Sequence, residues 1–129
     1  MKRVIITGGS TGLGQELSKQ FLQQGREVVC LSRTKPPLDV AHLETDFTDK
    51  GSIAQSVATL KKQYADFSVV ICCAGIGYIE KLEEMNYEHT QAMFDVNLIG
   101  QSYLLSGLAE EIRHNVADLV FIGATIGFK

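Results

Sequence analysis

The stretch VIITGGSTGLG (Val4–Gly14) joins a short apolar run directly to a glycine-rich turn. Its first four residues are all β-branched, which favours a buried strand. Leu13, Leu17 and Phe21 then lie at i, i+4 and i+8, the spacing of one face of a helix. A glycine turn between such a strand and such a helix suits phosphate groups, because the first N–H groups of the helix point outward and the helix dipole favours an anion.

The spacing of the glycines separates this turn from other phosphate-binding loops. A Walker loop needs Lys after its last glycine, where this chain has Gln15. The pattern G-x-G-x-x-G also fails, because no glycine stands three residues after Gly14. The pattern that fits is T-G-x-x-x-G-x-G, through Thr7, Gly8, Gly12 and Gly14. We interpret it as a dinucleotide-binding turn rather than a merely tight connection.

Apolar runs and helical patterns alternate along the rest of the chain. Further strands are predicted at 27–32, 41–45, 68–73 and 119–122, and helices at 12–24, 49–64 and 86–114, with a short helix in the loop 79–85. Apolar strands separated by helices indicate an α/β fold, a Rossmann-like doubly wound parallel sheet of about five strands in the order 3-2-1-4-5. The connection between strands two and three carries Pro36 and Pro37, so strand three is expected to be short.

The longest predicted helix carries an apolar stripe, formed by Phe94, Leu98, Leu105, Leu108 and Ile112. The fifth predicted strand, Leu119–Ile122, is apolar throughout and is therefore expected to be buried.

Composition and charge argue for a single soluble domain. The chain has 129 residues, 45% of them apolar and 21% charged, and a net charge of −3. No basic field exists to hold nucleic acid or an anionic membrane, and no run suits a signal peptide or a membrane span. We interpret Cys30, Cys72 and Cys73 as buried thiols in a reducing, cytoplasmic compartment. The histidines lack metal-ligand spacing, so no metal site is predicted.

These motifs together resemble the short-chain dehydrogenase/reductase (SDR) family of the classical type. The matching stretches beyond the glycine turn are ETDFTD with Asp46, CCAG at 72–75, VNLIG with Asn97, and GATIG after strand five. The resemblance spans the whole chain. It implies one NAD(P)-binding Rossmann domain over 1–129 and an oxidoreductase that transfers hydride between a nicotinamide and a carbonyl or alcohol. The residues that it places at the cofactor are Gly8, Ser10, Thr11, Gly12, Leu13, Gly14, Ser32, Arg33, Asp46, Phe47, Ala74 and Gly75.

Two positions depart from the family's pattern after strand four. Cys72 and Cys73 stand where the family has two asparagines whose side chains help tie the sheet together. Thiols are weak hydrogen-bond partners, so this tie is expected to be weaker here. The backbone of Ala74 and Gly75 can still approach a ribose.

The end of strand two bears on the choice of cofactor. In NAD-binding sheets an acid about 20 residues after the glycines holds the ribose 2′-OH. Here Ser32-Arg33-Thr34-Lys35 occupies that place, and an Arg pairs with a 2′-phosphate. NADP is therefore predicted, with NAD as the alternative. The basic residue that NADP-binding members often carry before the second glycine is missing, because Thr11 stands there.

The catalytic groups implied by the resemblance are only partly present. Asn97 matches the family's helix asparagine, but Ala124 stands at the position of the family's serine. Thr125 is one residue on, and its side chain would reach the site only through a local kink. No Tyr-x-x-x-Lys occurs in the sequence, and in the family it follows the serine by about a dozen residues, beyond Lys129.

The expected identity is therefore the N-terminal, cofactor-binding portion of a longer reductase, truncated before the rest of the family's sheet and not catalytically competent alone. One alternative is a natural NAD(P)-binding regulatory module. Another is a flavodoxin-like FMN protein, whose loop needs hydroxyls where Gly9 and Gly14 stand. An exposed edge of strand five and an apolar helix face predict a homo-oligomer. The substrate is not readable from these residues.

Overall fold

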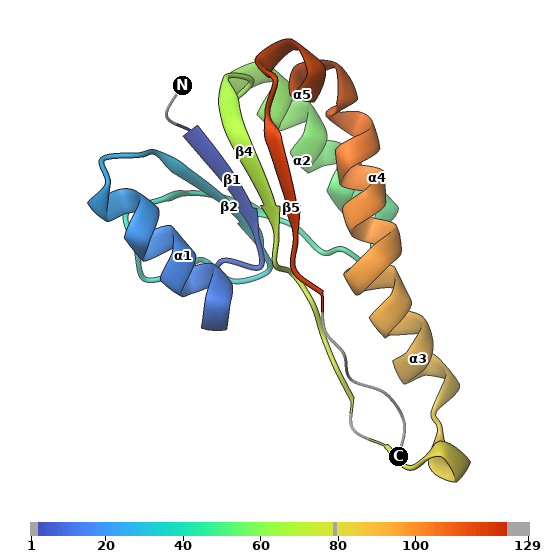
Figure 1. The fold of residues 1–129 in the computed structure, drawn as a ribbon. Coiled ribbons are helices and arrows are strands. Elements are labelled where there is room, and N and C mark those ends of the chain that lie inside the picture. The colour runs from blue at the N-terminus through green and yellow to red at the C-terminus, as the bar shows by residue number, and fades with distance from the viewer. Residues whose placement is uncertain (1–2, 79, 124–129) are drawn as a thin grey trace.

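The computed structural model describes residues 3–78 and 80–123, and a five-stranded sheet lies at its centre (Figure 1). The strands are β1 (Arg3–Thr7), β2 (Val28–Ser32), β3 (Ala41–Glu44), β4 (Phe67–Cys72) and β5 (Asp118–Phe121). Every neighbouring pair is parallel, and the order is β3-β2-β1-β4-β5. The predicted fold class and strand order are confirmed, and all the strands end at one edge of the sheet.

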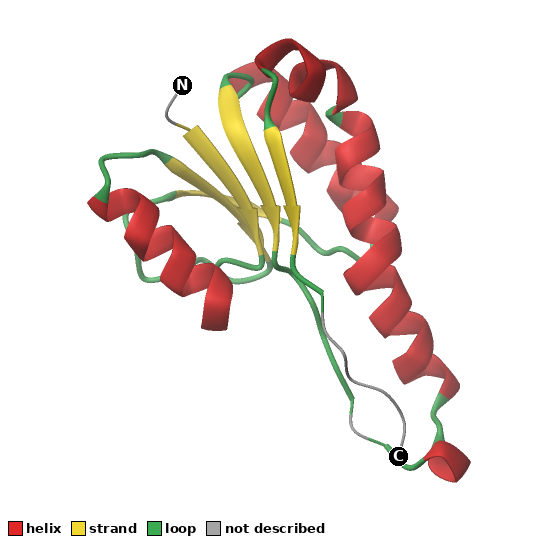
Figure 2. Ribbon diagram, in the orientation of Figure 1, coloured by secondary structure: helices red, strands yellow, loops and turns green. Residues whose placement is uncertain are grey.

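Helices cover both faces of this sheet, as Figure 2 shows. They are α1 (Gly12–Gln23), α2 (Lys50–Gln63), α3 (Tyr87–Phe94), α4 (Gly100–Gly107) and α5 (Ala109–Asn115), with a 3₁₀ turn η1 (Leu82–Glu84) and a π turn η2 (Asp95–Ile99). α1 lies on one face, and α2, α4 and α5 lie on the other. None of the described helices combines the length and apolarity needed to cross a lipid bilayer.

Alternation along β1 divides the apolar core into two layers. Val4 and Ile6 pack with Leu17 and Phe21 of α1, whereas Ile5 points to the other face and joins the larger cluster with α2 and α4. Successive side chains of a strand point to opposite faces, so a strand that is apolar throughout serves both layers. The sheet is therefore fixed from both sides beneath the strand ends.

The stripe predicted for the long helix is partly wrong. Phe94 is 56% exposed and Leu98 52% exposed, while the buried positions of this run are Gly100, Gln101, Leu104 and Leu108. The reason is the π turn at 95–99. A π turn adds a residue to one turn, so side chains before and after it no longer follow one 3.6-residue face.

The fifth strand is also more exposed than its composition predicts. Leu119, Val120 and Phe121 are 46%, 38% and 48% exposed. β5 is the last strand in the sheet order and pairs with β4. Among the described residues, no strand lies beyond it, so its apolar side chains are not enclosed as those of β1 and β2 are.

Candidate functional site

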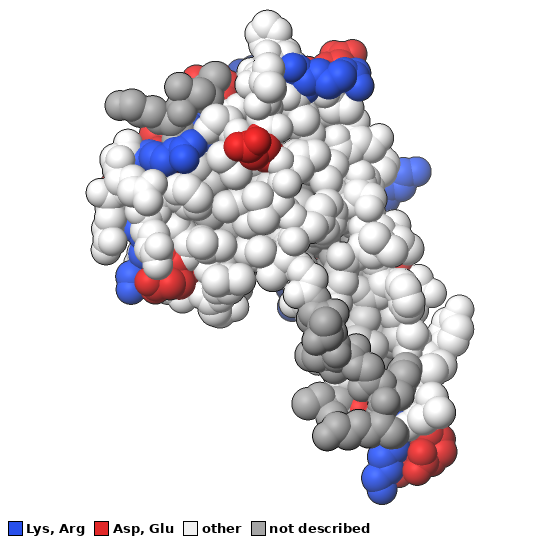
Figure 3. Space-filling view, viewed as in Figure 1, with Lys and Arg blue, Asp and Glu red and all other residues white. Residues whose placement is uncertain are grey.

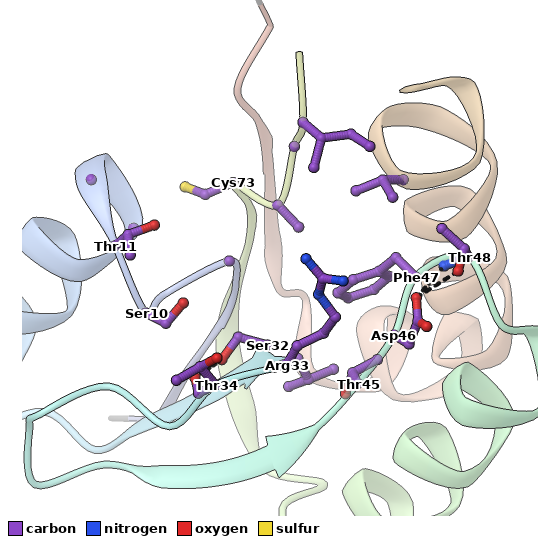
Figure 4. Close-up of a pocket in the computed structure, with 18 of the residues that line it drawn as sticks. Ser10, Thr11, Ser32, Arg33, Thr34, Thr45, Asp46, Phe47, Thr48 and Cys73 are labelled. Atoms are coloured by element: carbon purple, nitrogen blue, oxygen red, sulfur yellow. Dashed lines mark hydrogen bonds between the residues drawn. The ribbon is translucent and has the colours of Figure 1, made fainter. Parts of the chain in front are cut away.

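A cavity of about 660 Å³ opens at the carboxyl ends of the strands. Its wall is formed by the segments that follow β1, β2, β3 and β4, by Ala92 and Val96 of the long helical run, and by Ile122 after β5. Ligands of open α/β sheets bind at this edge. All twelve residues that the sequence resemblance places at the cofactor line this one cavity, and several of them are seen in Figure 4.

Two glycines allow the turn after β1 to pack closely on its neighbours. Gly8 has φ +71°, and a Cβ there would lie 2.6 Å from the Cα of Ala74. A Cβ on Gly14 would lie 2.4 Å from the carbonyl oxygen of Gly8. Gly12 differs, because a Cβ there would meet no atom within 4 Å. The turn therefore packs closely on Ala74 and on itself, whereas the space beside Gly12 is free.

The N-terminus of α1 borders the cavity through Gly12, Leu13 and Gly14. The side chain of its N-cap, Thr11, makes no capping hydrogen bond, and the first turn carries no acidic residue. α2 is different, because its N-cap Asp49 accepts hydrogen bonds from two backbone N–H groups. The first amides of α1 are therefore left without a side-chain cap at the cavity wall, which suits an anionic group.

The end of β2 presents a cation to the cavity. The Ser32 hydroxyl donates to the Thr34 carbonyl at 2.6 Å and lies 3.1 Å from Nε2 of His42, so it is held in place. Arg33 is exposed and extends into the cavity in Figure 4. Asp46, the acidic residue among the described lining residues, follows β3 rather than β2.

Asp46 is held as a carboxylate by its neighbour Thr48. Its Oδ1 accepts hydrogen bonds from the Thr48 hydroxyl at 2.7 Å and the Thr48 N–H at 2.9 Å (Figure 4). These bonds lower the pKa of Asp46, and the charge of Arg33 adds a smaller effect in the same direction. Asp46 is thus negatively charged at neutral pH.

Asn97 is exposed and is not one of the residues that line the cavity. Its side-chain Oδ1 accepts from the Ile76 N–H at 2.8 Å, and its Nδ2 donates to the Ile76 carbonyl at 2.9 Å. Both ends of the amide are used on the backbone of one residue. In this structure, therefore, the side chain holds the segment after β4.

Gln101 and the side chain of Thr7 were missed as site residues from the sequence. The Thr7 hydroxyl donates to Oε1 of Gln101 at 2.9 Å and accepts from the Ala74 N–H at 3.0 Å. Nε2 of Gln101 donates to the carbonyls of Ala74 and Val96, at 3.3 Å and 3.1 Å. The usable signal was a Gln four residues after Asn97 on the same helical run.

These bonds link β1 to the segment after β4, where the sequence predicted a weaker connection because of Cys72 and Cys73. The carboxyl end of β1 is joined to the segment after β4 by the Thr7 hydroxyl, and also by the bond from the Cys73 N–H to the Thr7 carbonyl at 3.2 Å. The connection is made by a hydroxyl, an amide and the backbone. It does not depend on the thiols.

The three cysteine thiols are unreactive at neutral pH. Cys30 and Cys72 are buried, as predicted, while Cys73 is half-buried and lines the cavity. Burial raises the pKa of Cys72 to about 12 and also raises the pKa of Cys30 and Cys73. All three therefore stay protonated at neutral pH and are poor nucleophiles.

A second group of ionisable side chains adjoins the cavity at Tyr78. The ring of Tyr78, which lines the cavity, stacks on the ring of His89 with centroids 3.8 Å apart. His89 Nδ1 hydrogen-bonds to the Glu80 carboxylate. The N–H of Asn86 and the contact with His89 lower the pKa of Glu80. This group fastens the loop after β4 to the start of α3.

The position of the family's serine falls in the sequence after β5. Ala124, which stands at that position in the sequence, and its neighbour Thr125 both lie outside the described residues.

Comparison with known proteins shows which family this chain is similar to. Residues 2–129 match the short chain dehydrogenase family. An NAD-dependent glycerol dehydrogenase of Listeria innocua is 30% identical over 114 residues, which are 81% of this chain and 44% of that protein.

Two solved structures illustrate the similarity of the fold. A short chain dehydrogenase of Leptospira borgpetersenii with bound NAD+ has a TM-score of 0.84 and 26% identity, over 92% of this chain and 49% of that one. An alcohol dehydrogenase of Thermococcus sibiricus complexed with 5-hydroxy-NADP has a TM-score of 0.83 and 24% identity, over 93% and 57%. The chain thus spans about half the length of these proteins.

Proposed function

This chain belongs to the short chain dehydrogenase family, and we propose that it is the N-terminal, NADP(H)-binding part of an oxidoreductase acting on a carbonyl or alcohol. The observation that carries the proposal is the cavity at the strand ends, with an uncapped helix N-terminus on one wall and Arg33 on another. A bound nicotinamide dinucleotide supplies or accepts the hydride in such chemistry. Every other contribution must come from residues of the protein.

The turn after β1 fits the diphosphate of the cofactor. The first amides of α1 lack a side-chain cap, and Gly12 leaves the adjacent space open. Backbone N–H groups at a helix start bind phosphate oxygens without adding bulk. Ser10 and Thr11 line the same wall and offer hydroxyl groups.

The wall at the end of β2 fits an adenosine that carries a 2′-phosphate. Arg33 offers a planar set of N–H donors, which pairs well with phosphate. Ser32 and Thr34 lie on either side of it. Asp46 and Phe47 line the neighbouring wall, where a carboxylate can accept from the adenine amine.

The segment after β4 fits the ribose next to the nicotinamide. Ala74 and Gly75 line the cavity and bring backbone rather than bulky side chains to it. Asn97 holds the following residue, Ile76, in place. The proton-transfer pair Tyr-x-x-x-Lys does not occur in the sequence, so we propose that this chain binds the cofactor without turning over a substrate.

The test is a fluorescence titration of the purified chain with NADPH and with NADH. We expect tighter binding of NADPH. Arg33→Ser should weaken NADPH binding by roughly tenfold to a hundredfold, because a charge-assisted hydrogen bond is lost, and should leave NADH binding nearly unchanged.

The matched control is Arg113→Ser, which removes the same charge at an exposed position on α5, outside the cavity lining. It should change neither affinity. Equal affinity for the two dinucleotides would contradict the NADP assignment. A folded chain that binds neither of them would contradict the proposed function as a whole.

A further inference from the structure

The side-chain amides of Asn97 and Gln101, four residues apart on one helical run, form hydrogen bonds with the segment after β4. We call this set of bonds the grip. We propose that Gln101 is a positioning residue, which acts with Asn97 to hold the backbone of 74–76 so that Gly75 presents its peptide groups to the cavity. The consequence of this grip for NADPH affinity rests on the proposed function, whereas its effect on hydrogen exchange does not.

The contacts of Gln101 account for its whole amide group. The side chain is buried, with 1% of the residue exposed. Its Oε1 accepts from the Thr7 hydroxyl, and its Nε2 donates to the carbonyls of Ala74 and Val96. A buried amide with both ends bonded has little freedom to reorient, because any other position leaves buried polar groups unpaired.

The spacing of the two amides matches the spacing of the groups that they hold. Residues four apart on a helix are separated by roughly 6 Å along its axis. Residues two apart on an extended chain are separated by roughly 6.6 Å and direct their N–H and C=O groups to the same side. Asn97 can therefore bond Ile76 while Gln101 bonds Ala74. The helical run acts on this segment as a neighbouring strand would.

The grip leaves one residue between the two held positions. Both backbone polar groups of Ala74 are bonded, its N–H to Thr7 and its C=O to Gln101, and both of Ile76 are bonded to Asn97. Within the described part of the chain, the N–H and C=O of Gly75 make no hydrogen bond. Since Gly75 lines the cavity, its free peptide groups are available to the hydroxyls of a ribose.

The π turn sets the position of Gln101. The Gly100 N–H bonds to the Asp95 carbonyl, five residues back. A Cβ on Gly100 would lie 2.5 Å from the Phe47 carbonyl oxygen, so the absence of a side chain lets the helix approach that wall of the cavity. The next residue, Gln101, therefore stands deep enough to reach both Thr7 and Ala74.

Hydrogen exchange of the unmodified chain tests the bonds that Thr7 and Asn97 accept from the N–H groups of this segment. The amides of Ala74 and Ile76 should exchange more slowly than those of Gly75 and Gly77, by on the order of tenfold or more, because only the first two are bonded. Equal exchange at these four positions would overturn the proposal, whether or not the protein binds a dinucleotide.

Gln101→Met tests the consequence for binding, because it keeps the length of the side chain and removes its three hydrogen bonds. We expect faster exchange at Ala74 and about tenfold weaker NADPH binding, because a smaller fraction of molecules has the segment in its competent position. Thr7→Val removes the hydroxyl that bonds both Gln101 and the Ala74 N–H. It should likewise speed exchange at Ala74 and weaken NADPH binding. In the double variant the two losses should not add, since both changes remove one hydrogen-bonded unit.

Leu108→Val is the matched control, because Leu108 is fully buried on the same helical run and does not line the cavity. It should lower the thermal midpoint but leave the NADPH affinity within roughly twofold of the unmodified chain, since it creates a cavity without removing a hydrogen bond. The proposal is overturned if Gln101→Met or Thr7→Val behaves like this control, losing stability alone. Failure of the unmodified chain to bind NADPH, with alternating exchange intact, would count against the proposed function and not against the grip.

Discussion

Gly14 and Gly77 both occur near the cavity, but only one of them is tightly enclosed. A Cβ on Gly14 would lie 2.4 Å from the Gly8 carbonyl oxygen, whereas a Cβ on Gly77 would meet no atom within 4 Å. Gly14→Ala should therefore lower the free energy of unfolding by about 1–3 kcal/mol, because the turn after β1 must shift. Urea unfolding measures this, and Gly77→Ala is the control. Equal stability of the two variants would contradict the close packing of the turn.

Because of the buried Cys72 thiol, we expect the free energy of unfolding to fall as the pH becomes alkaline. Burial raises the pKa of its thiol to about 12 in the folded state, whereas the pKa of an unfolded thiol is about 8.5. Between these values the unfolded chain loses a proton that the folded chain keeps, so stability falls as pH rises above about 8.5, by at most ~1.4 kcal/mol per pH unit.

Urea unfolding at pH 8 and at pH 10 checks this, with Cys72→Ala as the comparison. The variant starts from a lower stability but should lose less between the two pH values. The same pH slope in both proteins would show that the buried thiol is not the cause.

At the scale of the element, α1 and α2 differ in how their N-termini are capped. Asp49 caps α2 by accepting from the N–H groups of Gly51 and Ser52, but Thr11 makes no such bond at α1. Asp49→Ala should therefore lower the free energy of unfolding by about 1 kcal/mol, and Thr11→Ala by clearly less. Thermal unfolding measured by circular dichroism compares them. A larger loss for Thr11→Ala would mean that α1 has a side-chain cap in solution.

In the long helical run, periodicity predicted that the region is helical but not that a π turn divides it. The pattern correctly placed helical structure in the region from Asn86 to His114, but it treated the run as one regular helix. The structure divides it into α3, a π turn, α4 and α5. Because the π turn rotates α4 relative to α3, Phe94 and Leu98 are exposed while Gln101 is buried. A local pattern carries no signal for that rotation.

At the scale of the whole molecule, apolar side chains remain exposed along β5 and the long helical run. Phe94, Leu98, Leu119 and Phe121 are all exposed. In Figure 3 few charged side chains appear over β5 and α4. An exposed strand edge beside apolar surface favours self-association. We therefore predict a concentration-dependent dimer or larger species, measured by light scattering.

Leu119→Lys should shift the chain toward monomer, because it places a charge on the edge strand. Leu82→Lys adds the same charge at the exposed 3₁₀ turn, which lies far from β5 in Figure 1, and should leave the association unchanged. A monomer at all concentrations in the unmodified chain would contradict the prediction.

The amino-acid sequence by itself determined the five parallel strands, their order, and the glycine turn that borders the cavity. These features rest on short apolar runs, β-branching and the steric limits of a turn, which act over a few residues and are therefore visible in a short stretch such as Val4–Gly14. The family resemblance of the sequence also named the twelve proposed cofactor residues. They line one cavity because parallel strands bring their carboxyl ends to one edge.

Only the tertiary structure decided how that edge is held. The bond between Thr7 and Gln101 joins residues 94 positions apart, and it forms because a π turn and a side-chain-free Gly100 set the helix against Phe47. The exposure of β5 likewise depends on which elements cover it, not on its own composition. Contacts between distant residues depend on how complete elements pack, so no local pattern in the sequence specifies them.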